Sequence, residues 1–186
     1  MAYCGKHTFS LIILLIAAIF AVAATSQCAI LPAICRAEEG SGAENSEEMA
    51  SYTTSFASSG TGRVNNIRLA AAALNGYTVQ PGQELSFNAA VGERTTERGY
   101  SVAKVIVDGE YVEGVGGGVC QVSSTLYNAW VLAGLDVVRV QGHSLPSGYV
   151  PMSQDATVSE YIDLVLKNDT AFPVQVRTKT DGTDLS

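Results

Sequence analysis

The sequence predicts an α+β protein in which two main helices pack on a mostly antiparallel sheet. Apolar residues recur at helical spacing in two segments, one around Ile67 and one around Leu126. Short runs rich in β-branched residues lie between and after these segments, and turn dipeptides bound them. The dipeptides are Pro81-Gly82, Asp108-Gly109, Asn168-Asp169 and Asp181-Gly182.

The first half of this pattern begins with a helix. Its apolar face carries Val64, Ile67, Ala71 and Leu74, and Asn75-Gly76 supplies a stop signal. The elements expected next are a strand, a mixed apolar stretch and a polar loop, at Tyr77–Val79, Leu85–Val91 and Gly92–Gly99.

A hairpin and a glycine run precede the second helix. Asp108-Gly109 separates the runs Ser101–Val107 and Glu110–Val115, which predicts a β-hairpin. The glycine-rich segment Gly114–Gly118 follows directly, and Gly134 ends the helix after it. The apolar face of that helix consists of Val122, Leu126, Ala129, Trp130 and Ala133.

The C-terminal part reads as further strands. A strand is expected at Leu135–Val140 and a loop at Gly148–Gln154. Three more strands are expected at Ala156–Val158, Ile162–Leu166 and Val174–Thr178.

The N-terminus has the pattern of an export signal. Lys6 and His7 precede an uncharged apolar run from Phe9 to Ala24, and small residues follow. The run is about sixteen residues long, whereas a comfortable bilayer span needs about 20. Residues 1–37 are therefore expected to be a signal peptide or, as the alternative, an N-terminal membrane anchor at residues 9–24. Residues 38–51 form an acidic Gly/Ser linker and residues 52–186 the globular domain, which either interpretation places outside the cytoplasm.

Charge excludes one class of partner. The net charge is −7, and the eleven basic residues are scattered along the chain. Nucleic-acid binding requires clustered Lys and Arg, so no nucleic-acid partner is expected.

One cysteine belongs to the globular part. Cys4, Cys28 and Cys35 lie in or beside the signal region, whereas Cys120 stands where the glycine run enters the second helix. Unpaired N–H groups and the helix dipole at such a position favour a thiolate, which is the nucleophilic form. These N–H groups can also hold an oxyanion.

A nucleophilic cysteine needs a base, and His143 is the one histidine beyond the signal region. Asp155 follows it as the candidate orienting group, with Asp163 as its rival. The order of helix-borne Cys, then His, then Asp is that of papain-like and transglutaminase-type enzymes, which makes that fold type a candidate. The predicted roles are nucleophile for Cys120, base and then acid for His143, and orienter for Asp155. Candidate substrate-binding or oxyanion residues are Gly117, Gly118, Gln121, Ser123 and Ser124.

A structural interpretation of the same residues stays open. Cysteine often serves only as a small buried apolar residue, and the glycines can simply allow close packing. A metal site lacks the close ligand pairs that zinc prefers, so neither a metal nor a cofactor is expected.

At these residues the chain resembles the VanW family. The blocks that carry the resemblance are SFNAAVGERTTERGY, AKVIVDGEYVEGVGGGVCQVSSTLYNA, AGLDVV, HS, YVP and DATV, from about Tyr52 to Thr178. The resemblance implies a bacterial envelope protein in a peptidoglycan context, without implying a defined activity. Longer members of the family carry peptidoglycan-binding-like modules before this domain and a G5-type module after it, and the residues of this chain are not expected to form either.

The sequence therefore indicates two alternative functions. The first is a module that binds peptidoglycan, its precursor or an envelope protein. Its groove would use Tyr100, Tyr111, Tyr149, Asn88 and Gln121. The second is a thiol enzyme, an amidase, peptidase or acyl transferase, that acts on cell-wall peptide bonds through Cys120.

Overall fold

The computed structural model describes residues 47–107 and 109–186. Within them lie three helices, α1 (Thr61–Leu74), α2 (Phe87–Val91) and α3 (Val119–Leu132). The strands of these residues are β1 (Thr54–Ser55), β2 (Thr78–Val79), β3 (Glu84–Ser86), β4 (Val102–Val107), β5 (Glu110–Val115), β6 (Asp136–Arg139), β7 (Val165–Lys167), β8 (Val174–Gln175), β9 (Thr180–Asp181) and β10 (Asp184–Leu185).

The α+β prediction is confirmed, and every strand pair described is antiparallel. The strands do not form one sheet, however. They form four small sheets in the orders β1-β10-β9, β2-β8, β3-β7-β6 and β4-β5. Strands of two to six residues are too short to extend a common ladder around both long helices, so each small sheet covers a different part of them.

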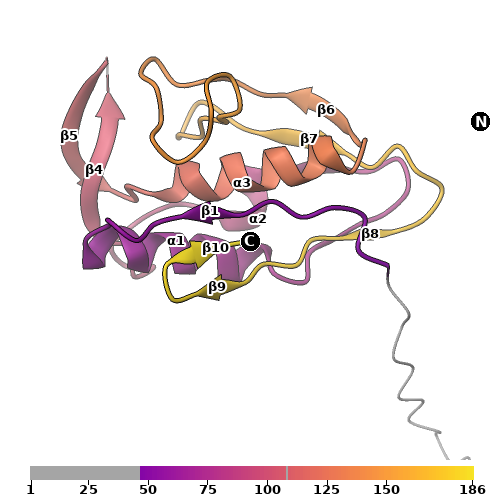
Figure 1. The fold of residues 1–186 in the computed structure, drawn as a ribbon, viewed down its shortest axis with the longest axis horizontal. Helices are drawn as coiled ribbons and strands as arrows, with labels where there is room; N and C mark the ends of the chain where they lie inside the picture. Colours follow the sequence, from indigo (N-terminus) through magenta and orange to yellow (C-terminus); the bar gives the residue numbers. More distant parts are fainter. Residues whose placement is uncertain (1–46, 108) are drawn as a thin grey trace, which may run out of the picture. The chain divides into compact units, whose positions relative to one another are not determined.

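Helix α3 is the central element. It lies between the β6 and β7 strands on one side and α1 and β1 on the other (Figure 1). Nine of its fourteen residues are buried, and five of the nine are polar. A helix buried around most of its circumference must satisfy its polar side chains through neighbouring segments. The polar residues of α3 therefore determine where those segments lie.

The apolar core joins α1 to the β3-β7-β6 sheet. Ile67 and Leu74 of α1 are fully buried, as are Leu85 of β3 and Leu166 of β7, which pair across the sheet. Burial of a side chain of this size contributes roughly 1.5–3 kcal/mol. Buried residues of α3 belong to the same core, so α1 and α3 pack against each other. The side chains at the starts of the two helices, among them Arg63 and Cys120, are therefore carried by a common packed unit.

Both long helices end as the sequence predicts. Helix α1 stops before Asn75, and α3 is followed by Gly134, whose φ of 74° is left-handed. The stretch Leu85–Val91 resolves into strand β3 and the short helix α2, because the Ser86 hydroxyl accepts a hydrogen bond from the Ala89 N–H and starts the helix.

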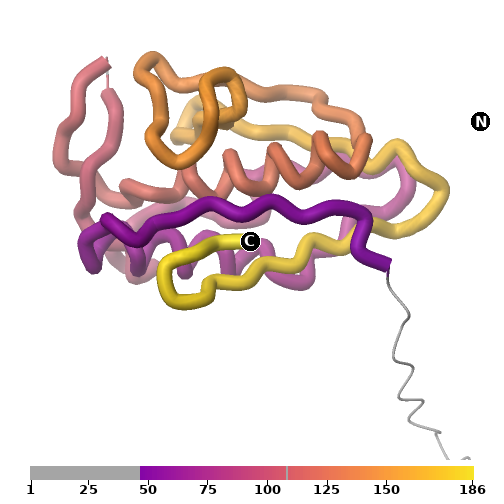
Figure 2. The backbone as a smooth tube through the Cα atoms, in the orientation of Figure 1, coloured from indigo at the N-terminus to yellow at the C-terminus, as the bar shows by residue number. Residues whose placement is uncertain are grey.

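The predicted strand Ala156–Val158 is wrong. These residues form no strand, because the side chains of α3 take the hydrogen bonds that a neighbouring strand would need. The segment that follows β6 instead folds back over the N-terminal half of α3, as the orange part of the tube shows (Figure 2). The other predicted strands are present: Glu110–Val115 has the predicted bounds, and the remaining ones are shorter than expected.

The predicted signal or anchor at residues 1–37 lies outside the described residues, as does most of the linker at 38–51. Among residues 47–107 and 109–186, no helix is long and apolar enough to cross a membrane.

Candidate active site

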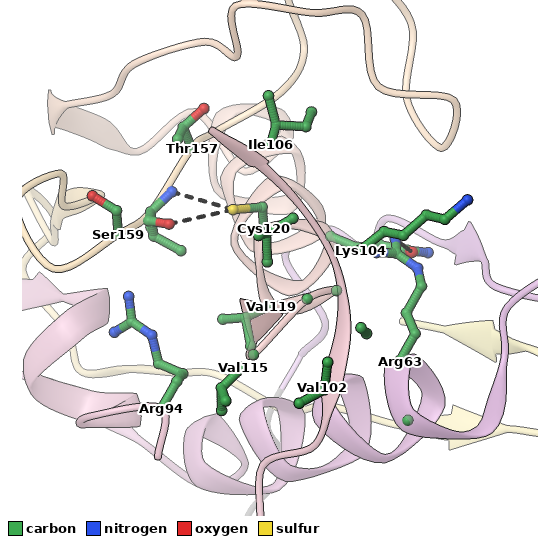
Figure 3. Close-up of a pocket in the computed structure, with 18 of the residues that line it drawn as sticks. Arg63, Arg94, Val102, Lys104, Ile106, Val115, Val119, Cys120, Thr157 and Ser159 are labelled. Atoms are coloured by element: carbon green, nitrogen blue, oxygen red, sulfur yellow. Dashed lines mark hydrogen bonds between the residues drawn. The ribbon is translucent and has the colours of Figure 1, made fainter. Parts of the chain in front are cut away.

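Cys120 is the second residue of α3, and its side chain borders an open cavity of about 1800 Å³, called here the Cys120 pocket. The hairpin β4–β5 forms one wall and residues Thr157–Ile162 form another. The thiol is partly exposed, and its hydrogen-bond contacts are both with the backbone of Val158 (Figure 3). Sγ lies 3.4 Å from the Val158 carbonyl oxygen and 3.5 Å from its nitrogen. The sulfur is therefore held at the pocket edge rather than beneath apolar side chains.

The glycine run allows the chain to enter α3 at this place. Gly118 has a φ of 109°, a left-handed conformation that favours glycine. A Cβ at Gly117 would lie 2.5 Å from the Lys104 carbonyl oxygen, so no side chain fits there without moving strand β4. Asn66 of α1 fixes the turn by donating hydrogen bonds to the carbonyls of Ser101 and Gly117, both at 2.9 Å.

The polar face of α3 holds the segment that carries Asp155. The Ser123 hydroxyl donates to the Ala156 carbonyl, and the Ser124 hydroxyl accepts from the Ala156 N–H at 2.9 Å. One turn further on, the Asn128 amide donates to the Gln154 carbonyl at 2.7 Å. Residues 154–158 are thus bound to the same helix that carries Cys120.

Asp155 in turn binds His143. Its Oδ2 lies 2.6 Å from the His143 Nδ1 and accepts a second hydrogen bond from the His143 backbone N–H at 2.5 Å. The two side chains are only 7% and 12% exposed. Because Nδ1 is occupied by the carboxylate, Nε2 is the ring nitrogen left for another partner.

The Cys120 sulfur is close enough to influence this ring. Burial lowers the pKa of His143, but the Cys120 sulfur and the Asp155 carboxylate raise it by more, so the net pKa lies above the ordinary 6.5. The pKa of Asp155 lies below its ordinary 3.8: burial raises it, and the hydrogen bonds from His143 lower it by more. The hydrogen bonds that the Cys120 sulfur makes by distance and angle go to the Val158 backbone.

Residues 62–186 match the protein family described as VanW like protein. The chain belongs to this family. The match covers most of the residues that line the Cys120 pocket and all three predicted catalytic residues, and it confirms the resemblance seen in the sequence.

Two curated proteins are similar to this chain in sequence. The uncharacterized protein YoaR of Bacillus subtilis is 44% identical over 139 residues, which are 74% of this chain and 46% of YoaR. The vancomycin B-type resistance protein VanW of Enterococcus faecalis is 32% identical over 125 residues, 64% of this chain and 46% of that protein. The chain thus spans about half the length of the curated relatives it matches. No solved structure matches it, so the papain and transglutaminase comparison rests on residue order alone.

Of the five other predicted site residues, three have buried side chains that bind neighbouring segments, and two are glycines of the pocket wall. Ser123 and Ser124 are fully buried and bind the Asp155 segment, while Gln121 is 1% exposed and joins α3 to β1 by donating to Thr54 and Ser55. Gly117 and Gly118 line the pocket. Direct contact of these five residues with a substrate stays a prediction.

Backbone N–H groups at the start of α3 can hold an oxyanion. In the described part of the VanW domain, the N–H groups of Gly117, Gly118 and Cys120 have no hydrogen-bond acceptor. All three residues line the pocket beside the sulfur. Such donors suit the negative oxygen of a tetrahedral intermediate on Sγ.

Asp163, the alternative candidate for orienting His143, binds other residues. Its carboxylate accepts hydrogen bonds from the Ser86 hydroxyl at 2.6 Å and the Asn88 N–H at 2.9 Å, at the start of α2. Asp155 is therefore the carboxylate that binds His143. Residues 47–107 and 109–186 hold no group of three or more His, Cys, Asp or Glu side chains that fits a metal ion.

Two residues of the Cys120 pocket, Arg63 and Thr157, were missed by the sequence analysis, whereas Tyr149, which was expected in a binding groove, lines this pocket. Arg63 stacks on the ring of Tyr149, with 5.7 Å from its Cζ to the ring centroid. Thr157 has a buried hydroxyl with no hydrogen-bond partner. Arg63 and Thr157 reach the pocket from segments about 60 and 40 residues away from Cys120, and no local motif marks them.

Proposed function

We propose that this chain is an exported cell-envelope protein whose VanW domain performs thiol-dependent acyl transfer on peptide bonds of peptidoglycan or its precursor. Export is supported by the apolar run at residues 9–24, which serves as signal or membrane anchor. The envelope setting is supported by membership of the VanW family and by a relative whose name is that of a vancomycin resistance protein.

One observation supports the chemistry: the His143 ring is hydrogen-bonded through Nδ1 to Asp155, and the Cys120 sulfur contributes to the raised pKa of the same ring. This is the relationship that a nucleophile, its base and an orienting carboxylate require. A hydrogen bond between the thiol and the ring nitrogen can form or tighten when substrate binds.

The reaction follows from these groups. His143 takes the thiol proton at Nε2, and the Cys120 sulfur forms a bond to the carbonyl carbon of a substrate amide. The negative oxygen receives hydrogen bonds from the backbone N–H groups at the start of α3. When the C–N bond breaks, His143 returns its proton to the leaving nitrogen, and a thioester remains. Water or an amine then attacks the thioester, losing a proton to His143, and the sulfur leaves as the thiol.

Intact-mass spectrometry tests the proposal. The full chain is incubated with soluble peptidoglycan fragments, prepared by cleaving the glycan strands of a bacterial wall. Wild-type protein is expected to gain the mass of an acyl fragment that has lost its amine, and Cys120→Ser protein to gain no thioester. Absence of both an adduct and any change in the fragments would contradict the proposal.

A second function, a binding module without catalysis, is favoured by one observation. The two contacts of Sγ with the Val158 backbone give Cys120 a structural role, since they help to hold the Asp155 segment on α3. In that case Cys120→Ser, whose hydroxyl keeps one donor and an acceptor, would retain fragment binding and envelope function.

A further inference from the structure

Arg63 is built into the Cys120 pocket from the first turn of α1. The aliphatic part of its side chain passes over Gly118, where an added Cβ would lie 2.8 Å from the Arg63 Cγ. A larger residue at position 118 would therefore displace the Arg63 side chain. Its Nε donates to the Ser59 hydroxyl at 3.1 Å, and its Nη2 donates to the Gln121 Oε1 at 2.7 Å. In Figure 3, Arg63 and Arg94 flank Cys120 on opposite sides.

The charge of Arg63 has no carboxylate partner in the described part of the chain. The described ion pairs involve other residues, and Asp155 is engaged by His143. Burial lowers the pKa of Arg63, while Tyr149, Cys120 and Tyr111 raise it by less, and no carboxylate contributes. The guanidinium thus loses hydration in this position without an opposite charge to compensate.

The hydrogen-bond donors of Arg63 are likewise only partly used. A guanidinium has five N–H donors, and two of them are satisfied by Ser59 and Gln121, which leaves three without an acceptor in the described residues. The Tyr149 ring covers one face of the group and limits its rotation. A fixed fork of free donors is the arrangement that binds a carboxylate through two parallel hydrogen bonds.

Thr157 provides an independent observation on the same pocket. Its hydroxyl is the buried side-chain polar atom that lacks a hydrogen-bond partner within the described residues. Thr157 is one of the residues that line the Cys120 pocket, and it is labelled in Figure 3. Buried hydroxyls are normally paired, so an unpaired one at a pocket wall indicates that a ligand completes the site.

We propose that Arg63 binds a carboxylate of the substrate and thereby positions the peptide for attack by Cys120. This rests on the proposed function for the identity of the substrate, a wall peptide that bears a free carboxylate. Arg63 acts as a specificity-determining residue: a peptide whose carboxylates are converted to amides loses the paired charge and the two charge-assisted hydrogen bonds.

Binding is measured by isothermal titration calorimetry with the full chain carrying Cys120→Ala, which prevents turnover. The probes are glycan-cleaved peptidoglycan fragments and the same fragments with their carboxylates amidated chemically. Native fragments are expected to bind about ten- to a hundredfold more tightly than amidated ones, as the loss of charge-assisted hydrogen bonds predicts. Arg63→Gln in this background is expected to abolish the difference, and Arg63→Lys to restore part of it because the charge remains without the fork.

The matched control is Arg68→Gln, since Arg68 is an exposed arginine on the same helix. It is expected to keep the full preference for native fragments. Arg63→Gln protein that retains the preference, or native fragments that do not bind, would overturn the assignment. Because Cys120 is absent from every binding arm, these outcomes are independent of the adduct experiment, whose failure would reject the acyl-transfer chemistry alone.

Discussion

The Asp155 carboxylate binds His143 at two points with a single oxygen, accepting hydrogen bonds from the ring at 2.6 Å and from the backbone N–H at 2.5 Å. The first fixes the ring and its tautomer, and the second fixes the loop on which the ring stands. Asp155 is itself held by α3, through the hydrogen bonds of Ser123 and Ser124 to Ala156. The helix that carries the sulfur therefore also places the base.

Asp155→Asn tests this orientation. The amide can accept from the His143 backbone or donate to the ring, and donation would turn the ring to the wrong tautomer. We expect the rate of thioester formation to fall by about a hundredfold or more, while thermal unfolding changes little. The control is Asp163→Asn, the same substitution at the carboxylate that binds the start of α2 and not His143. Equal losses in both variants would contradict the assigned role.

The ion pair predicts a pH window for stability. Folding raises the pKa of His143, so its contribution is complete below pH 6.5 and is lost as pH rises through the folded value. Folding lowers the pKa of Asp155, so its contribution is complete above pH 3.8 and is lost as pH falls through the folded value. The pair therefore stabilises the fold most between pH 3.8 and 6.5.

Urea unfolding of wild-type and His143→Gln protein checks this window. The difference in unfolding free energy is expected to be larger at about pH 5.5 than at about pH 9. A difference that grows toward alkaline pH would show that the sign is wrong.

Thr157→Val separates stability from binding. The unpaired hydroxyl costs free energy in the folded state, so its replacement by a methyl group of similar shape is expected to stabilise the protein by about 1 kcal/mol. Fragment binding is expected to weaken in the same variant, because the ligand loses a hydrogen-bond partner. Thermal unfolding and calorimetry measure the two effects, and a variant that is destabilised without weaker binding would contradict this account of Thr157.

Ser124→Ala tests the attachment of the Asp155 segment to α3. The Ala156 N–H loses its acceptor, and a buried unpaired donor costs about 1–3 kcal/mol. Ser58→Ala, at an exposed serine, is expected to change the unfolding free energy by less than about 0.5 kcal/mol. Similar values for both variants would show that the Ser124 hydrogen bond does not stabilise the segment.

Turns, helix ends and helix faces could be predicted from the sequence because they depend on residues that are close together in the chain. The hairpin at Asp108-Gly109, the glycine after α3 and the helical spacing around Ile67 each depend on residues a few positions apart. The segment Ala156–Val158 could not be predicted in this way. Its β-branched sequence favours a strand, but buried hydroxyls of α3 supply its hydrogen bonds, and this tertiary contact overrides the local preference.

In the candidate site, too, some residues could be selected from the sequence and others depend on tertiary contacts. Cys120, His143 and Asp155 could be selected from the sequence because few residues of the right chemistry exist in the globular part. Arg63 could not, because its proposed role depends on its stacking with Tyr149 and on the lack of a carboxylate partner among the described residues. Ser123 and Ser124 were selected for a contact with substrate, whereas the structure places them inside the protein.

The coupling between Cys120 and His143 is tested most directly by NMR titration of the His143 ring. His7→Ala leaves a single histidine, because the chain has two. The pKa of His143 is expected above 6.5 with Cys120 present and lower in Cys120→Ala protein, since the sulfur raises it. An unchanged pKa on removal of the sulfur would contradict the claim that thiol and imidazole form one unit.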